Sequence, residues 1–430
     1  MRIVGITAEY NPMHTGHVYH LAKAKEVSGA DFAVVCMSGS FTQRGEPALF
    51  DKWTRSRIAV VNGADLVLEL PFAFATSSAP DFAFGAMEIF RRLGLVTDVA
   101  FGTEAGNLEL LNRVARLTEE EPEPFVTILK EGLAKGLSFA AARGLAITKL
   151  LGEESGEAAK KPNNILAIEY IKESFRWEAS PTLHSILREG DYHQGGQSPS
   201  AEAMRKRALR SISQRAGRKE RLALALAEDG FGGEAPAETQ KALADNILHL
   251  GDPERMLPLL RTRLLTMKEE EMATCAGVRE GMEHRFKELA RKGENLSQLI
   301  DSIKTKRNTY TGVARALLHV LPGLPQQDFR ALCQKTERDP QARQGGGRYY
   351  PGLYARVLAA GEKGRELLRL LKEEERRSLP LVTEINRGDK GPLLTYDILA
   401  ADLYNTALAR DLYMGCDYVK KPFIAIAERD

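Results

Sequence analysis

Two histidines near the N-terminus, His14 and His17, are the residues whose type and spacing point most directly to chemistry. They belong to the run Glu9-Tyr10-Asn11-Pro12-Met13-His14-Thr15-Gly16-His17, which follows a short apolar segment. Residues three apart share one face of a helix. The first turn of a helix also offers unpaired backbone N–H groups and the positive end of the helix dipole. Because Gly16 lacks a Cβ, a phosphate can approach the backbone closely. The run therefore predicts a phosphate site in which imidazoles stabilise charge that develops in a transition state.

The kind of phosphate chemistry follows partly from motifs that the sequence lacks. There is no GxxxxGK[ST] segment and no kinase-like glycine-rich loop, so phosphoryl transfer is not indicated. An HxGH motif after a strand indicates attack at the α-phosphate of ATP, with pyrophosphate as the leaving group. This reaction needs positioning and charge stabilisation and no protein nucleophile. Four residues alone are a weak pattern, since two surface histidines can fall near a helix start by chance.

The first 105 residues predict the frame that positions these side chains. Short apolar runs typical of buried strands are separated by segments with helical spacing. The strands are expected at 2–8, 31–37, 64–70 and 96–101, and the helices at 15–28, 52–62 and 81–93. Such alternation indicates an α/β fold with a Rossmann-like, doubly wound parallel sheet, whose ligands lie at the carboxyl ends of the strands. The polar segments 9–17, 38–48, 71–80 and 102–106 fall at those ends.

The rest of the chain is expected to be mostly α-helical. Residues 107–175 are mostly helical, with a helix at 165–174, and 181–186 is a further strand candidate. A linker is expected at 229–233 and a helical bundle at 235–375. Two short strands are expected at 378–382 and 393–396, before a last helix at 397–413. We divide the chain into a catalytic domain (1–205), a helical domain that binds RNA (206–375) and a small α/β subdomain that packs on the rest (376–430).

Composition and length exclude several classes of protein. The 430 residues are 43% hydrophobic and 27% charged, with a formal net charge of +2, as expected of a soluble globular protein. No apolar run approaches the roughly 18 residues of a membrane span, and the N-terminus lacks the features of a signal peptide. Four scattered cysteines form no CxxC pair, the other histidines show no ligand spacing, and no GxSxG elbow appears. We therefore expect a cytoplasmic protein without a membrane segment, a structural metal site or disulfides.

Longer motifs relate this pattern to a known family. They are Glu9-Tyr10-Asn11-Pro12, His14-Thr15-Gly16-His17-Val18-Tyr19-His20, Met37-Ser38-Gly39-Ser40-Phe41-Thr42-Gln43-Arg44-Gly45-Glu46-Pro47-Ala48, Glu69-Leu70-Pro71, Phe101-Gly102-Thr103-Glu104 and Pro162-Asn163-Asn164-Ile165-Leu166. On these segments the chain resembles the HxGH nucleotidylyltransferase superfamily and, more closely, the bacterial tRNA(Met) cytidine acetate ligases. The motifs concentrate in the first 205 residues, with a looser match at Lys306-Arg307-Asn308-Thr309-Tyr310.

The resemblance implies a two-step reaction. Acetate attacks the α-phosphate of ATP to give acetyl-adenylate and pyrophosphate. The N4 amine of the wobble cytidine in elongator tRNA(Met) then takes the acetyl group, which gives N4-acetylcytidine and AMP. A mixed anhydride activates an otherwise unreactive carboxylate, so the site must exclude water until RNA arrives. The implied partners are ATP, with Mg²⁺ held mostly by phosphates and water, acetate and tRNA(Met), and no obligate protein partner is evident.

The resemblance also implies roles for individual residues. His14 and His17 hold the phosphates, and Gly102 lets the adenosine approach the chain. Arg44 suits carboxylate or phosphate binding as a catalytic residue, with a structural salt bridge as the alternative. The alternative role for Asn163 is a helix N-cap, and that for Arg188 is a surface charge. The implied nucleotide-binding residues are Thr7, Ala8, Glu9, Tyr10, Asn11, Pro12, Met13, His14, Thr15, Gly16, His17, Val18, Tyr19, His20, Gly102, Asn163, Asn164 and Arg188, and those near acetate or cytidine are Ser38, Gly39, Gln43, Arg44 and Glu46.

One stretch departs from the superfamily pattern. Members usually carry a later Ile-Ser-Ser-Thr-x-Ile-Arg segment that touches the triphosphate at a helix start. The nearest match here is Pro199-Ser200-Ala201-Glu202-Ala203-Met204-Arg205, in which Glu202 replaces the threonine. An acidic side chain that faced the triphosphate would repel it unless magnesium intervened or the side chain pointed away.

Basic clusters are the candidate RNA surface. Residues 205–219 hold seven basic residues and no acid, and a second cluster surrounds 304–315, with Tyr310 available for stacking. Solvated helix faces are the alternative reading. The candidate tRNA contacts are Arg205, Lys206, Arg207, Arg210, Lys306 and Arg307.

Two other functions compete with the ligase. A small-metabolite adenylyltransferase would need little beyond the nucleotide domain, so more than 200 additional helical residues with basic clusters argue against it. An RNA-binding or assembly protein with a relict nucleotide site is the non-enzymatic alternative. The intact His14 and His17 argue against this non-enzymatic alternative, whereas Glu202 in place of the threonine is compatible with it.

Overall fold

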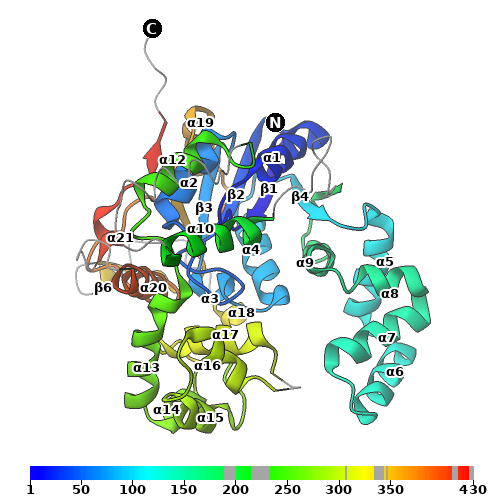
Figure 1. Cartoon of the computed structure of the whole chain (residues 1–430). Helices are drawn as coiled ribbons and strands as arrows, with labels where there is room; N and C mark the ends of the chain where they lie inside the picture. The colour runs from blue at the N-terminus through cyan, green and yellow to red at the C-terminus, as the bar shows by residue number, and fades with distance from the viewer. Residues whose placement is uncertain are drawn as a thin grey trace.

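A mainly parallel sheet forms the centre of the protein in the computed structural model, which describes residues 1–187, 200–214, 233–305, 308–333, 343–344, 347–408 and 415–425 (Figure 1). Its strands follow the order β10-β8-β3-β2-β1-β4-β5, with β9 paired to β8. The β3–β8 pair is antiparallel and the other pairs are parallel. The strands are β1 (Ile3–Ala8), β2 (Phe32–Ser38), β3 (Leu66–Leu70), β4 (Asp98–Thr103), β5 (Thr182–Leu187), β8 (Ala355–Ala360), β9 (Leu381–Val382) and β10 (Phe423–Ile424).

Helices cover both faces of this sheet, because successive side chains of each buried strand point to opposite sides. Ile3 and Val34 belong to one hydrophobic cluster, and Val4 and Val35 belong to the other. The first cluster includes α4 (Ala79–Leu93) and α9 (Pro162–Ser174). The second includes α1 (Thr15–Ser28), α2 (Lys52–Val61), α10 (Ala201–Gln214) and α12 (Ala237–Asp245). The expected doubly wound α/β fold is confirmed, and β1 to β5 lie within two residues of their expected positions.

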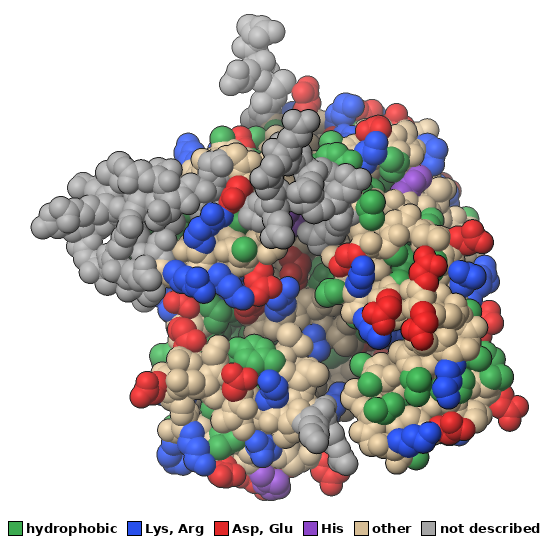
Figure 2. Space-filling model, turned by 45° about the vertical axis from the view of Figure 1, so that its right-hand side comes forward, with side chains coloured by type: hydrophobic (Ala, Val, Ile, Leu, Met, Phe, Trp, Pro, Cys, Tyr) green, Lys and Arg blue, Asp and Glu red, His purple; other side chains and the backbone are tan. Residues whose placement is uncertain are grey.

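Two groups of helices extend from the sheet. Figure 1 shows them at the lower left and lower right, and Figure 2 shows the surface hollowed between them. One group comprises α5 (Leu108–Glu120), α6 (Glu123–Ala134), α7 (Phe139–Leu151) and α8 (Glu153–Ala158). The other comprises η1 (Pro253–Met256), α13 (Leu257–Thr266), α14 (Glu269–Ala273), α15 (Met282–Leu289), α16 (Leu296–Ile303) and α17 (Tyr310–Val320). Other short elements are the helices α3 (Phe72–Ala75) and α18 (Phe329–Cys333) and the hairpin of β6 (Arg343–Gln344) and β7 (Gly347–Arg348).

The C-terminal part of the chain returns to the central sheet, which differs from the expectation of an all-helical segment at 235–375. Strand β8 buries all six of its residues against β3, and α19 (Glu362–Glu373) follows it. The strand expected within 378–382 is confirmed as β9. The strand expected at 393–396 is wrong, because α20 (Leu394–Ala407) begins there, followed by α21 (Cys416–Val419). The local composition of 355–360 suits a helix, and the pairing with a strand almost 300 residues earlier decides otherwise.

A buried cluster of charged side chains holds the C-terminal part of the chain against the central sheet. Lys52 of α2 donates to Glu69 of β3 at 2.8 Å and to Asp417 of α21 at 2.8 Å. Arg356 of β8 donates to the same Asp417 oxygen at 2.6 Å and lies 3.3 Å from Glu69. Although burial opposes it, Arg356 and Lys52 hold the pKa of Asp417 below its ordinary value. Two cations and two carboxylates therefore neutralise each other in the core, as buried charges must.

A third carboxylate, Asp397 of α20, lies close to this cluster. It accepts a hydrogen bond from the backbone of Phe72 at 2.6 Å and another from the hydroxyl of Tyr354. Burial, together with the charge of Glu69, raises the pKa of Asp397 to about 7. The side chain thus joins α20 to α3 and changes its protonation near neutral pH.

We predict that Arg356→Met destabilises the protein by about 3–5 kcal/mol, because it leaves Glu69 and Asp417 with Lys52 as their one remaining cation. Urea unfolding measures the change. The double variant Arg356→Met/Asp417→Leu restores one cation to one anion and is expected to recover part of the loss. A single variant within about 0.5 kcal/mol of wild type would contradict the role of the cluster.

The stability contribution of Asp397 should depend on pH. A carboxyl whose pKa is raised in the folded state contributes stability at low pH and loses it as the pH rises through about 7. Asp397→Asn cannot ionise, so its free energy of unfolding should rise relative to wild type between about pH 5 and about pH 8. Urea unfolding at several pH values measures this difference, and a constant difference would show that Asp397 does not titrate in this range.

Candidate active site

The two histidines cap the helix that follows β1. His14 is the N-cap of α1, and its Nδ1 accepts a hydrogen bond from the backbone of Gly16 at 3.0 Å. The Nδ1 of His17 accepts in return from the backbone of His14 at 3.3 Å, which makes a capping box from two imidazoles. Their rings stack with centroids 3.8 Å apart. Because each Nδ1 is an acceptor, each neutral ring carries its proton on Nε2 and can donate it to a phosphate oxygen.

The position of the His14 ring is a second reason why residue 16 is glycine. A Cβ at this position would lie 2.8 Å from Cε1 of the His14 ring. The glycine thus leaves room for the capping imidazole, in addition to the close approach of a phosphate that its lack of a side chain allows.

Tyr10 closes the other side of this loop. Its ring meets His17 edge-on at a centroid distance of 5.2 Å, and its backbone takes the left-handed conformation with φ of 46°. The side chain is buried, yet its hydroxyl has no hydrogen-bond partner among the residues that the structure describes. A buried hydroxyl in this state is expected to bond a group that is absent here. The loop therefore fits a polar ligand such as a nucleotide.

The loop after β2 lies against the loop after β1. The carboxylate of Glu9 accepts from the backbone of Gln43 at 2.7 Å, and the amide oxygen of Asn11 accepts from Leu49 at 2.6 Å. Burial raises the pKa of Glu9, although the Gln43 hydrogen bond opposes this shift. Ser38 is buried at the end of β2. The segment expected to bind ATP and the segment expected to bind acetate or cytidine are thus neighbours at the carboxyl ends of β1 and β2.

Arg55 joins these two loops, and this role was not predicted from the sequence. Its side chain is 1% exposed and donates to the carbonyl oxygens of Glu9 at 2.6 Å, Phe50 at 3.0 Å and Gly39. The signal in the sequence is helical spacing, because Arg55 lies three residues after Lys52 and three before the apolar Ile58. A basic pair on the buried face of a helix indicates internal acceptors.

Helix α10 is docked on the β2 loop by reciprocal ion pairs. Arg44 lies 2.8 Å from Glu202, and Glu46 pairs with Arg205. Glu202 also binds Lys206 at 2.6 Å, and these contacts lower its pKa. Glu202, which stands where the superfamily segment has threonine, therefore has two cationic partners.

The structure places Arg205 inside the protein, which corrects its expected position on an RNA surface. The side chain is 6% exposed and donates to the carbonyl oxygens of Pro47 and Gly251 at 3.0 and 2.9 Å. An arginine among internal acceptors is not available to a phosphate backbone. Its neighbours Lys206 and Arg210 are exposed, and Arg207 is partly exposed and paired with Glu234.

The end of β4 meets the start of α9. Glu104 accepts from the backbone of Asn163 at 3.2 Å and of Asn164 at 3.0 Å, so its carboxylate satisfies the helix N-terminus. Asn164 is fully buried, accepts from the backbone of Glu104 at 2.8 Å and donates to Ala158 at 3.0 Å. Its amide is thus committed to the fold, whereas the partly exposed Asn163 donates its side-chain amide to Glu104 at 2.6 Å. Gly102 lies in β4 beside these residues.

Some expected site residues lie outside the described part of the chain, namely Arg188, Lys306 and Arg307. Within the described ranges, no group of three or more His, Cys, Asp or Glu side chains could hold a metal ion. Across those same residues, no helix is long and apolar enough to span a membrane.

The strand, the histidine cap and the adjacent loops together define a nucleotide-binding α/β domain, and comparison with known proteins assigns its class. The model of the HIGH Nucleotidyl Transferase family matches residues 1–414, so the chain belongs to this family.

More specific relatives share nearly the whole length. The chain is 36% identical to the tRNA(Met) cytidine acetate ligase of Halothermothrix orenii over 94% of each protein. It is 35% identical to the ligase of the same name from Acetivibrio thermocellus, over 97% of this chain and 95% of the relative. A crystal structure of Thermotoga maritima TmcAL bound with α-thio ATP superposes with a TM-score of 0.81 and 29% identity, covering 99% of this chain and 100% of that one.

We predict that Gly16→Ala weakens ATP binding by about tenfold or more, because the new methyl group displaces the His14 ring from its capping position. Isothermal titration calorimetry measures the affinity. Gly144→Ala is the matched control, since nothing lies within 4 Å of a Cβ at that helical position. Equal affinities in the two variants would contradict the role of the His14 ring.

Proposed function

We propose that this protein is an ATP-dependent tRNA(Met) cytidine acetate ligase. The histidine capping box at the end of β1 carries the proposal, because it presents two Nε2 donors at a helix N-terminus. The full-length similarity to ligases of that name supports the acceptor. In the first step an acetate oxygen attacks the α-phosphorus of ATP and pyrophosphate leaves. In the second step the cytidine N4 amine attacks the acetyl carbon, AMP leaves and a proton is released.

The residues divide the work according to their position. His14 and His17 donate to phosphate oxygens as negative charge increases on them. The hydroxyl of Tyr10 bonds the nucleotide, and Asn163 contacts it from the start of α9. Arg44 stands at the β2 loop, where a guanidinium can bind the acetate carboxylate. Mg²⁺ enters with ATP and is held mainly by phosphate oxygens and water. We further propose that the enzyme acts in the cytoplasm without an obligate protein partner.

We predict that His17→Gln abolishes acetate-dependent ATP–pyrophosphate exchange while the fold persists. Glutamine at this helix position retains the reciprocal hydrogen bond to the His14 backbone, as in ordinary capping boxes, but lacks the imidazole donor. Exchange is measured with labelled pyrophosphate, and circular dichroism monitors the fold. His284→Gln is the control, because that ring is 70% exposed and lies on α15. Unchanged exchange in His17→Gln would remove the phosphate role of this side chain.

The complete reaction is tested by mass spectrometry of tRNA after incubation with ATP and acetate. An acetylated cytidine is the expected product. Exchange that does not depend on acetate would favour a small-metabolite adenylyltransferase, and the absence of any exchange would favour an RNA-binding protein with a relict site.

A further inference from the structure

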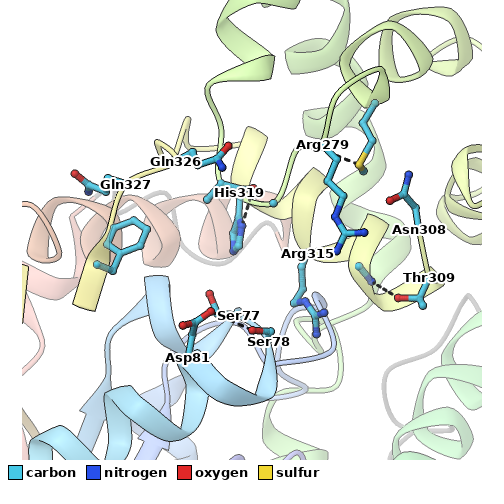
Figure 3. A pocket seen from close by; sticks show the side chains of 15 residues that line it. Ser77, Ser78, Asp81, Arg279, Asn308, Thr309, Arg315, His319, Gln326 and Gln327 are labelled. Carbon is cyan, nitrogen blue, oxygen red and sulfur yellow. Dashed lines mark hydrogen bonds between the residues drawn. The ribbon is translucent and has the colours of Figure 1, made fainter. Parts of the chain in front are cut away.

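A pocket of about 350 Å³ lies beside the β2 loop and has no role in the proposed ATP site. Its walls come from the junction of α3 and α4, from α17 and from the segments 276–282 and 326–329 (Figure 3). The volume falls within the range of pockets that take small organic groups. It lies on the helical side of the protein, where no part of ATP is expected.

One wall of the pocket is positively charged. Figure 3 shows Arg279 and Arg315 on this wall, from two different segments. Burial and the charge of Arg279 both lower the pKa of Arg315, and the charge of Asp81 opposes this shift. Asp81 is the one acid among the described lining residues, and it already accepts from Arg330 at 3.0 Å. An anion such as a phosphate diester would therefore relieve the repulsion between the two arginines.

The floor of the pocket is neutral and fixed. Both ring nitrogens of His319 are bonded, Nδ1 to the carbonyl of Ala276 at 3.0 Å and Nε2 to the hydroxyl of Thr76 at 2.9 Å. Burial lowers the pKa of His319 to about 4, so the ring is uncharged at neutral pH. This histidine supports the pocket and does not add to its charge.

The remaining wall carries groups that can recognise a base. The side-chain amides of Gln326 and Gln327 line it and Phe329 adds an aromatic ring, while the amide of Asn308 lies across the pocket on the side of the two arginines. Amides both donate and accept hydrogen bonds, which suits the edges of unpaired bases, and aromatic rings suit their faces. Together with the arginines, the pocket combines the three features by which a single nucleotide is bound.

A short chain of contacts joins this pocket to the ATP site. Arg315 donates to the carbonyl of Gln43 at 3.3 Å, and the backbone of Gln43 donates to Glu9 at 2.7 Å. Gly45 packs so closely on α17 that a Cβ would lie 2.7 Å from the Arg315 nitrogen. The β2 loop therefore contacts both a wall of the pocket and the loop that follows β1.

We propose that this pocket binds an unpaired nucleotide of the acceptor RNA, next to the cytidine that is acetylated. Its phosphate lies against Arg279 and Arg315, and its base lies against the amides of Gln326 and Gln327. This assignment rests on the proposed function. It places the RNA loop across the β2 loop, so that the reacting cytidine reaches the acetyl-adenylate while its neighbour is anchored.

The test uses the full-length protein and an RNA stem-loop with the anticodon loop of tRNA(Met). Arg279→Ala is expected to raise the Kd of this RNA about tenfold and to reduce the slope of log Kd against log salt by about one. Gln327→Ala is expected to keep that slope and to lose discrimination against base changes beside the cytidine. Acetate-dependent ATP–pyrophosphate exchange without RNA should remain at the wild-type rate in both variants.

Arg291→Ala is the matched control, because it removes one exposed arginine from the same helical group outside the pocket. Equal RNA affinities in Arg279→Ala and Arg291→Ala would overturn the proposal, as would loss of exchange in Arg279→Ala, since the pocket would then serve the ATP step. Absence of acetate-dependent exchange in the wild-type protein would instead contradict the proposed function. Base-specific RNA binding that depends on Arg279 and Gln327 would support the pocket in either case.

Discussion

The guanidinium group of Arg55 is buried at the carboxyl ends of β1 and β2, among the carbonyl oxygens of Glu9, Gly39 and Phe50. A buried cation requires acceptors on every side because its desolvation is costly. These carbonyls begin the loop after β1, begin the loop after β2 and precede α2. One side chain therefore fixes the spacing of the two loops that meet at the site. The histidine cap, the Glu9–Gln43 contact and the position of the RNA pocket all depend on that spacing.

Charge is distributed over the site in layers. The innermost layer is the nucleotide loop, whose donors are imidazole and backbone N–H groups. Around it, Arg44 and Glu46 of the β2 loop pair with Glu202 and Arg205 of α10. These reciprocal pairs give Glu202 a cationic partner within the contact between α10 and the β2 loop. Exposed basic side chains lie farther out, at Arg279 and on α10, where an RNA backbone is expected.

The sequence predicted the parts of the fold that depend on local patterns. Strands β1 to β5 are apolar runs between helices, and the HxGH loop is a local motif, so both could be located from spacing alone. Strand β8 could not, because its burial comes from pairing with β3, far away in the sequence. Arg205 was expected at the surface because a basic run does not show which of its members turns inward. Arg55 was missed for a different reason, since its spacing from Lys52 and Ile58 indicates a buried position but its backbone carbonyl acceptors belong to other segments of the chain.

Strand β8 is synthesised long after β3, and this order has a consequence for folding of the chain on the ribosome. Strand β3 ends at residue 70, and its partner is complete only at residue 360. At about 5–20 residues per second, the outer edge of β3 waits roughly 15–60 s for that partner. An open edge invites pairing with other nascent chains, and a charged side chain on it discourages such pairing. Glu69 occupies this edge, and the residue opposite it in the register is Arg356. The carboxylate on the waiting edge thus faces a cation of the strand that completes the sheet, at 3.3 Å.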